Sequence, residues 1–246
     1  MILPQRSRSR LKAPPWPLTL LTVALCIAFT YLGRWQWHRG ELRTQAWDAF
    51  ARGADAAEPL GPKQLHDVAR YAHLRITGHF LPERQFLLDN RAHEGAPGYE
   101  VLTPFKLTDG RVLLVDRGWV AFTGKRSVLP DISFAPAANV TVGGRIDELP
   151  SSGLAFGHAA PSSDGSWPKL TSYPRVAELT AAFGKPLEQR MLLLDPGTAA
   201  GYVRDWQPPG LPPARHFAYA IQWWAFAFTL IVVWIVLAVR RARTAA

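Results

Sequence analysis

The chain has 246 residues, and its 28 basic residues against 19 acidic ones give a formal net charge of +9. Seven of the basic residues lie in the two terminal segments, 1–17 and 240–246, so residues 18–239 hold 21 basic residues against 19 acidic ones. The basic excess belongs to the ends of the chain, and the composition therefore does not predict a DNA or RNA partner.

The first predicted element is an apolar helix near the N-terminus. Leu18–Leu32 contains 15 residues without a charge, and a basic segment precedes it, a pattern that also fits a signal peptide. No small-x-small cleavage site follows, and segment 33–39 instead carries two tryptophans and two arginines, which is typical of a membrane interface. We therefore predict a retained transmembrane helix over residues 18–35. Good helix formers extend the helix to Arg52, before Gly53.

Strands separated by turn residues dominate the region that follows. The predicted strands are Tyr71–Phe80, Gln85–Asn90, Tyr99–Leu107, Arg111–Phe122, Asn139–Asp147 and Met191–Leu194. The third and fourth form a hairpin through Asp109-Gly110, and Gly143-Gly144 indicates a bulge or close packing. The other predicted elements are short helices over Lys63–Ala69 and Pro174–Phe183, a surface loop over Pro150–Pro168 and a stiff connector over Arg204–Pro213.

A second apolar helix lies near the C-terminus. Phe217–Val239 has 23 residues without a charge. As a helix it spans about 34 Å, enough to cross a hydrocarbon core of about 30 Å, and we predict a transmembrane helix over residues 216–239. Basic residues, with no acidic ones among them, precede the first helix and follow the second, which predicts that both ends of the chain are cytoplasmic. These residues are Arg6, Arg8, Arg10, Lys12, Arg240, Arg241 and Arg243. Arg34, Arg39 and Arg43 weaken this rule at the first helix.

The predicted fold is a membrane-anchored α+β protein. Two transmembrane helices flank one strand-dominated extracytoplasmic domain, residues 36–215, and the cytoplasmic tails are residues 1–17 and 240–246. The expected compartment is a bacterial cytoplasmic membrane. A mitochondrial inner membrane is the alternative, because Arg6–Arg10 has the acid-free composition of a transit peptide.

Sequence frames for catalysis are missing. There is no Gly-x-Ser-x-Gly segment, His93-Glu94 lacks the second histidine of a metalloprotease, and Thr123–Ser127 lacks the upstream glycine of a phosphate loop. Cys26 is the only cysteine, which excludes an intramolecular disulfide and a thiolate metal site. Any metal chemistry must rest on histidine, carboxylate or a cofactor that brings its own metal.

A histidine-and-aromatic cluster lies where the Pro-rich connector becomes the second apolar helix. On a helix, His216, Tyr219 and Trp223 share one face, with the small Ala220 between them. His38 is expected at a similar depth on the first helix. The arginines expected within about a turn of these histidines are Arg34, Arg39 and Arg215. A flat amphiphilic ligand with two carboxylates fits this place, and an ordinary interfacial anchor is the alternative.

Six segments, in order along the chain, form a recognisable set. They are Gly33-x-Trp35-Gln36-x-x-Arg39, Arg75–Gly78, Gly98–Phe105, Val115–Val120, Val142-x-Gly144-Arg145 and His216-x-x-Tyr219-Ala220-x-Gln222-Trp223. Together they resemble the Surfeit-locus family of cytochrome c oxidase assembly factors. The combination of Arg117-Gly118-Trp119 with the His216 helix start is the most specific part.

The resemblance implies an assembly factor rather than an enzyme. It implies delivery or stabilisation of haem a during insertion into cytochrome c oxidase subunit I, with haem a synthase as a further partner. The family histidine corresponds to His216, which becomes the expected iron ligand, whereas His38 falls on a variable position. The expected haem contacts are Tyr219 and Trp223 at the macrocycle and Arg34, Arg39 or Arg215 at the propionates.

Two other functions stay open at this point. A haem-free scaffold would bind oxidase subunits through the same membrane and external parts. A membrane-anchored hydrolase would need a nucleophile–base pair in the external domain, for which the sequence offers no frame.

Overall fold

The computed structural model describes residues 13–53, 57–61, 64–151, 157–199 and 201–244. The chain separates into two units. One unit, Met1–Asp48 with Pro209–Ala246, contains the two long helices, and the other, Ala49–Pro208, contains the strands. The predicted tail residues Arg6, Arg8, Arg10 and Lys12 lie outside the described residues.

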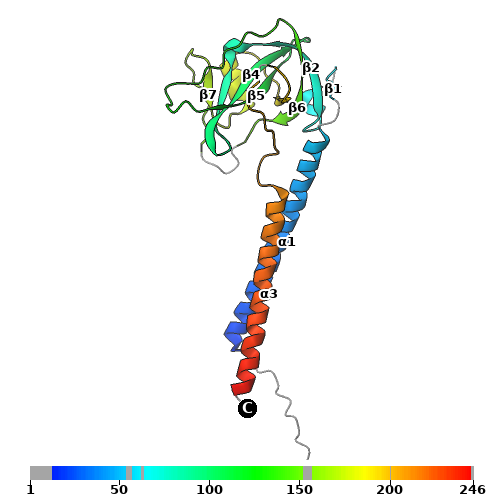
Figure 1. The fold of residues 1–246 in the computed structure, drawn as a ribbon, viewed down its shortest axis with the longest axis vertical. Helices are drawn as coiled ribbons and strands as arrows, with labels where there is room; N and C mark the ends of the chain where they lie inside the picture. The colour runs from blue at the N-terminus through cyan, green and yellow to red at the C-terminus, as the bar shows by residue number, and fades with distance from the viewer. Residues whose placement is uncertain (1–12, 54–56, 62–63, 152–156, 200, 245–246) are drawn as a thin grey trace, which may run out of the picture. The chain divides into compact units, whose positions relative to one another are not determined.

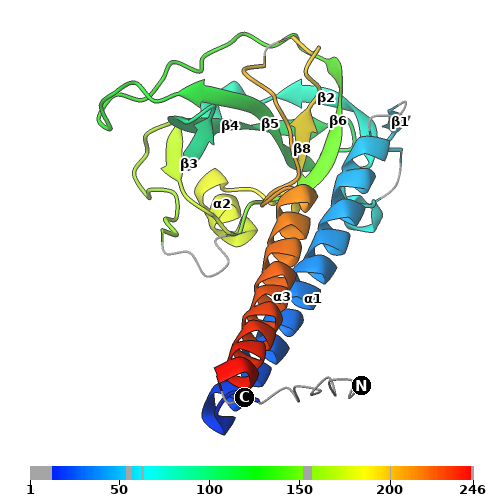
Figure 2. The same cartoon turned by 60° about the horizontal axis from the view of Figure 1, so that its bottom comes forward.

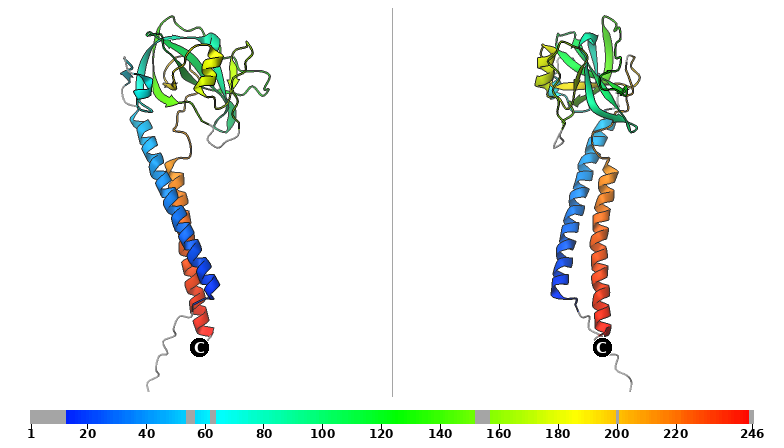
Figure 3. Two further views of the ribbon diagram at one scale, coloured as in Figure 1. Left: turned by 180° about the vertical axis from the view of Figure 1, so that it is seen from behind. Right: turned by 90° about the vertical axis from the view of Figure 1, so that its left-hand side faces the viewer.

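The helical unit is an antiparallel pair. Helices α1 (Trp16–Arg52) and α3 (Pro213–Thr244) lie side by side in every view (Figures 1 and 3). Both are long and apolar enough, by length and composition, to cross a membrane. The predicted extension of the first helix to Arg52 is confirmed, and the Gly53 N–H still donates to the Ala49 carbonyl at 3.1 Å. Pro213 opens α3, where a helix needs no N–H donor.

The second unit is built mostly of strands. They are β1 (Glu58–Pro59), β2 (His73–Phe80), β3 (Phe86–His93), β4 (Ala96–Leu107), β5 (Val112–Ala121), β6 (Val140–Glu148), β7 (Lys169–Thr171) and β8 (Arg190–Leu194). The helical elements are α2 (Val176–Phe183) and the 3-10 turns η1 (Leu65–Asp67) and η2 (Pro82–Arg84). The six predicted strands and the helix before Gly184 are confirmed, whereas the very short β1 and β7 were not predicted.

Five of these strands close into a barrel. Around it run β2, β6, β8, β5 and β4, and β4 pairs again with β2. Neighbours are antiparallel except β5 and β8, which are parallel. This is the strand order of the five-stranded Greek-key barrel found in OB folds. Figure 2 shows β3 continuing the sheet beyond β4, with α2 beside it.

Alternate residues of the barrel strands form the central core. Ile76, Phe105, Val115, Ile146 and Leu192 come one from each strand, and each is at most 2% exposed. Since successive side chains of a strand point to opposite faces, the residues between them form a second layer outside the barrel.

Helix α2 covers this second layer. Leu179 and Phe183 of α2 pack with Leu114 of β5 and Leu193 of β8 in one apolar cluster. The helix ends at Gly184, whose φ of +81° is the left-handed conformation that glycine adopts without a side-chain clash. The predicted helix end at this glycine is therefore confirmed.

Two details differ from, or decide between, the sequence predictions. Strand β4 begins at Ala96 rather than Tyr99, because it forms a tight hairpin with β3 through the left-handed residues Glu94 and Gly95. The pairing of β6 with β2 runs without a shift through Gly143-Gly144, so there is no bulge. A Cβ on Gly144 would lie 2.3 Å from the Leu193 carbonyl oxygen, and close packing is the correct alternative.

The Arg117-Gly118-Trp119 segment belongs to the packing of the strand unit. Arg117 is 2% exposed, and its guanidinium lies 3.7 Å from the centre of the Phe134 ring. Gly118 has a φ of +110°, and a Cβ there would lie 2.5 Å from the Val203 carbonyl oxygen. This oxygen accepts the Trp119 N–H at 2.8 Å, so the motif ties the last connector onto β5.

A buried carboxyl precedes this motif. Asp116 is fully buried, and its Oδ1 accepts the Gly118 N–H at 3.0 Å, whereas Oδ2 finds no hydrogen-bond partner among the described residues. Burial, together with the nearby negative charge of Glu100, raises the pKa of Asp116 well above its usual range. Asparagine at this position would keep the accepting oxygen without the charge.

We predict that Asp116→Asn stabilises the protein at neutral pH. The pKa of Asp116 is higher in the folded protein than in the unfolded chain. As pH rises from about 4, Asp116 therefore ionises in the unfolded chain first, and the folded state loses stability until pH reaches the folded pKa. The substitution should therefore raise the free energy of unfolding by about 1–3 kcal/mol at pH 7. Thermal unfolding followed at pH 4 and pH 7 measures this, and the gain should be absent at pH 4.

The control is Asp164→Asn. The pKa of Asp164 is lowered to about 2, chiefly by the Ser162 hydroxyl that donates to it. Removing this carboxylate charge should therefore lower the free energy of unfolding at pH 7. An Asp116→Asn protein that is less stable at pH 7 would contradict the buried-carboxyl account.

Candidate functional site

The helical unit is held together by a seam of small residues on α1. Thr19, Cys26, Gly33 and Gly40 recur every seven residues, the spacing that keeps one side of a helix against a supercoiled partner. A Cβ on Gly33 would lie 2.2 Å from Trp224 Nε1, and one on Gly40 would lie 2.6 Å from the Phe217 ring. Aromatic side chains of α3 therefore occupy the space that these glycines leave.

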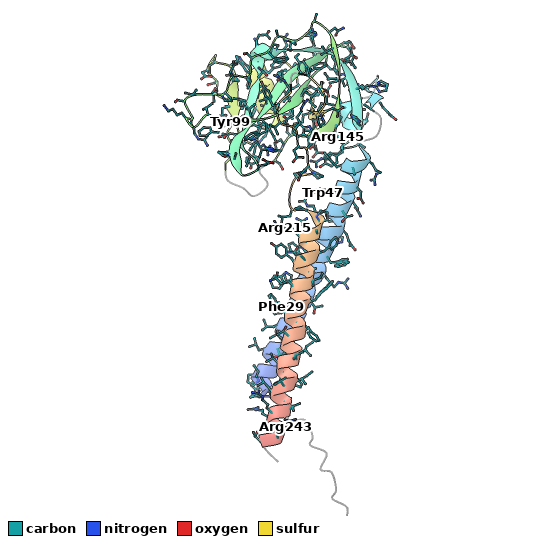
Figure 4. All side chains as sticks on the ribbon, viewed as in Figure 1. Phe29, Trp47, Tyr99, Arg145, Arg215 and Arg243 are labelled. Carbon is teal, nitrogen blue, oxygen red and sulfur yellow. The ribbon has the colours of Figure 1, made fainter. Side chains whose placement is uncertain are left out.

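Aromatic contacts flank this seam. On one side Trp37 contacts Phe217 and Trp224, with ring centres 4.8 and 5.7 Å apart. On the other side Phe29 stacks on Trp223 at 5.5 Å. Figure 4, in which Phe29 and Arg215 are labelled, shows such side chains along the pair. These contacts fix the rotation of each helix about its axis.

His216 lies at this seam and contacts α1. Its Nδ1 lies 2.9 Å from Oε1 of Gln36, and the side chain is half-buried. The amide oxygen only accepts, so Nδ1 carries the hydrogen and donates it. The second ring nitrogen, Nε2, then holds a lone pair, which is the form of imidazole that coordinates a metal.

The structure does not bring His38 beside His216. Residues 36 and 38 lie about 200° apart around a helix, so His38 points away from the side on which Gln36 meets His216. Its Nδ1 lies 3.5 Å from Glu41. It lines a separate groove of about 500 Å³ with Tyr31, Arg34, Trp35, Trp37, Glu41 and Trp224.

The other predicted site residues divide between these two sides. Arg34 lines the His38 groove. Trp223 lies about two turns from His216 along α3 and is covered on one face by Phe29. Tyr219 is 40% exposed, and Arg215 is also exposed. Arg39 lies about one turn from Gln36 on α1, and its guanidinium lies 5.9 Å from the centre of the Trp35 ring.

Arg43 belongs to the same side and was not among the predicted site residues. Its Nη1 donates to the Pro209 carbonyl at 2.8 Å, and its guanidinium fills the space beside Gly210, just before α3. Arg43 lies seven residues after Gln36, and this heptad spacing, which puts two residues on the same side of a helix, was the sequence signal that could have identified it.

Metal chemistry built from several protein ligands finds no support in the described part of the chain. Within it there is no group of three or more His, Cys, Asp or Glu side chains able to hold an ion. Two histidines of the strand unit pair with carboxylates instead. His73 lies 2.7 Å from Asp195, and His158 lies 3.0 Å from Glu178.

Comparison with known proteins decides the family. The model described as the SURF1 family matches residues 23–228, a range that contains both Gln36 and His216. The chain belongs to the SURF1 family. The predicted resemblance to the Surfeit-locus proteins is thereby confirmed.

Individual relatives are distant in sequence. A SURF1-like protein of Mycobacterium tuberculosis is 29% identical over 222 residues, which cover 87% of this chain and 79% of that protein. A SURF1-like protein of Rickettsia felis is 32% identical over 111 residues, covering 44% of this chain and 47% of the relative. The cytochrome oxidase assembly protein SHY1 of Saccharomyces cerevisiae is 32% identical over 117 residues, 45% of this chain and 29% of that protein.

We predict that Gly33→Leu destabilises the helix pair. The new side chain would collide with Trp224 and force the two helices apart, at a cost of about 1–3 kcal/mol. Thermal unfolding of the detergent-purified protein measures the loss. The matched control is Ala28→Leu, because Ala28 is an exposed residue of the same helix. Equal stability of the two variants would contradict the glycine seam.

Proposed function

We propose that the protein is a membrane-anchored assembly factor for cytochrome c oxidase that holds haem a at His216. The observation that carries the proposal is the His216–Gln36 contact, which leaves Nε2 of a half-buried imidazole available at the start of an apolar helix. Membership of the SURF1 family and the name of the yeast relative support the assembly role.

The membrane part of the proposal rests on the two long helices. Each contains an 18-residue window of high hydropathy, and only 6% and 11% of the two windows are buried, as expected for helices whose other faces meet lipid. Arg240, Arg241 and Arg243 follow the second window, so the positive-inside rule puts the C-terminus in the cytoplasm. Two spans then return the chain to the side on which it started, in a bacterial cytoplasmic membrane.

The residues around His216 fit haem a as a transported substrate. Haem a brings its own iron, so a single imidazole suffices for attachment, and the described residues supply no larger ligand set. Tyr219 and Trp223 lie about one and two turns beyond His216 along α3 and offer ring surfaces to a macrocycle. Arg39, Arg43 and Arg215 supply cations for the propionates.

Two predicted contacts are not part of this site. His38 and Arg34 line the groove on the other side of the pair, so the proposed haem site uses neither. A single axial histidine also suits transfer, because a ligand held through one protein–iron bond leaves more readily than one held through two. The strand unit is left to recognise the recipient, which we propose is oxidase subunit I, or the enzyme that makes haem a.

Haem retention tests the site. The chain is expressed in a host that makes haem a, purified in detergent, and its Soret absorbance is compared with that of His216→Ala and His38→Ala. We expect His216→Ala to lose most of the pigment, with imidazole added to the buffer restoring part of it, and His38→Ala to keep it.

Two outcomes would overturn this assignment. Equal pigment in His216→Ala and wild type would remove His216 as the ligand. Crosslinking to oxidase subunits without pigment in any variant would favour the haem-free scaffold.

Membrane topology has its own test. Cys26 is the only cysteine, so a Cys26→Ser background allows single cysteines to be placed at the exposed residues Ala137 and Thr244. A membrane-impermeant maleimide added to intact spheroplasts should label Ala137→Cys and leave Thr244→Cys unlabelled until the membrane is permeabilised. Labelling of both before permeabilisation would contradict the two-span topology.

A further inference from the structure

We infer that Gln36 is the positioning residue of the haem site, fixing the tautomer and rotation of the His216 ring so that Nε2 faces the iron. The inference rests on the proposed function, since it assigns a role relative to a ligand at His216. It concerns a side chain on α1 that makes no contact with the ligand itself.

The hydrogen-bond geometry carries the first step. A distance of 2.9 Å between Nδ1 and the amide Oε1 is that of a normal N–H···O hydrogen bond. A neutral imidazole has one N–H, and its donation to Gln36 assigns the lone pair to Nε2. Histidines that ligate metals usually donate their other N–H to a carboxylate, carbonyl or water, and Gln36 supplies the carbonyl here.

The helix seam carries the second step. Gln36 lies between Gly33 and Gly40, where α1 comes closest to the aromatic side chains of α3. Trp37 on one side of the seam and Phe29 on the other prevent α1 from rotating. The amide oxygen is therefore held by packing rather than by a flexible segment, and it can impose one orientation on the ring.

The acceptor type carries the third step. An amide oxygen is a weaker hydrogen-bond acceptor than a carboxylate, so it polarises the Nδ1–H bond less. The ring then keeps less negative charge, and Nε2 is a weaker electron donor to iron. A site that must release its haem needs an oriented ligand of moderate strength. Glutamine meets both requirements, and glutamate at the same position would meet only the first.

Two variants test the inference in the full-length protein loaded with haem a by the host. Gln36→Leu keeps the approximate side-chain size and removes the acceptor, whereas Gln36→Glu keeps the acceptor and strengthens it. We expect Gln36→Leu to lose haem to excess apomyoglobin about 10–100-fold faster than wild type. We expect Gln36→Glu to lose it more slowly.

The iron–imidazole stretching band of the ferrous protein is the readout that a purely structural role would not move. It should shift to higher frequency in Gln36→Glu and to lower frequency in Gln36→Leu, because the band reports the electron donation of Nε2. If Gln36→Leu does not fold, the shift in Gln36→Glu decides alone. Unchanged bands in folded variants would overturn the inference.

Failure of the inference is distinguishable from failure of the proposed function. If His216→Ala keeps its haem, the proposed site is wrong whatever the Gln36 variants do. If His216→Ala loses haem while both Gln36 variants keep the wild-type band and transfer rate, the haem site stands and the positioning role of Gln36 falls.

Discussion

The close approach of α1 and α3 at Gly33 and Gly40 is the constraint on which the candidate site depends. Only residues without a side chain leave room for the Trp224 and Phe217 rings at this distance. Once the rings are seated, the aromatic contacts on both flanks set the rotation of each helix. The meeting of Gln36 with His216 follows from that rotation, since neither residue could reach the other across a wider seam.

The strand unit depends on a different constraint, the closure of five strands around one core. Pairing of β4 with both β5 and β2 leaves no open edge between them, and one buried residue from each strand fills the interior. The motif Arg117-Gly118-Trp119 serves this closure by fastening the connector near Val203 onto β5. The two most specific segments of the family resemblance therefore act differently: one maintains the barrel, and the other, at His216, presents an imidazole.

Much of the fold could be predicted because its signals are local. Long uncharged runs, the Asp109-Gly110 turn and the glycine after Phe183 each depend on neighbours within a few residues, and these elements are confirmed. The two shortest strands, β1 and β7, depend instead on pairing with strands farther away in the sequence. The arrangement of the candidate site was predicted less well. The expected depth in the membrane put His38 level with His216, but depth does not determine which face of α1 carries the His38 side chain.

The sequence by itself determined that this protein has two apolar helices around one strand-rich region and a histidine at the start of the second helix. It also contained the ordered motifs of the protein's family. These properties are written in composition, periodicity and short motifs, which need no knowledge of distant contacts. Only the tertiary structure decided that Gln36, not His38, meets His216, and that Arg34 lines a groove with His38. The physical reason is that the facing sides of two packed helices are chosen by the fit of rings against glycines, which is a property of both helices together.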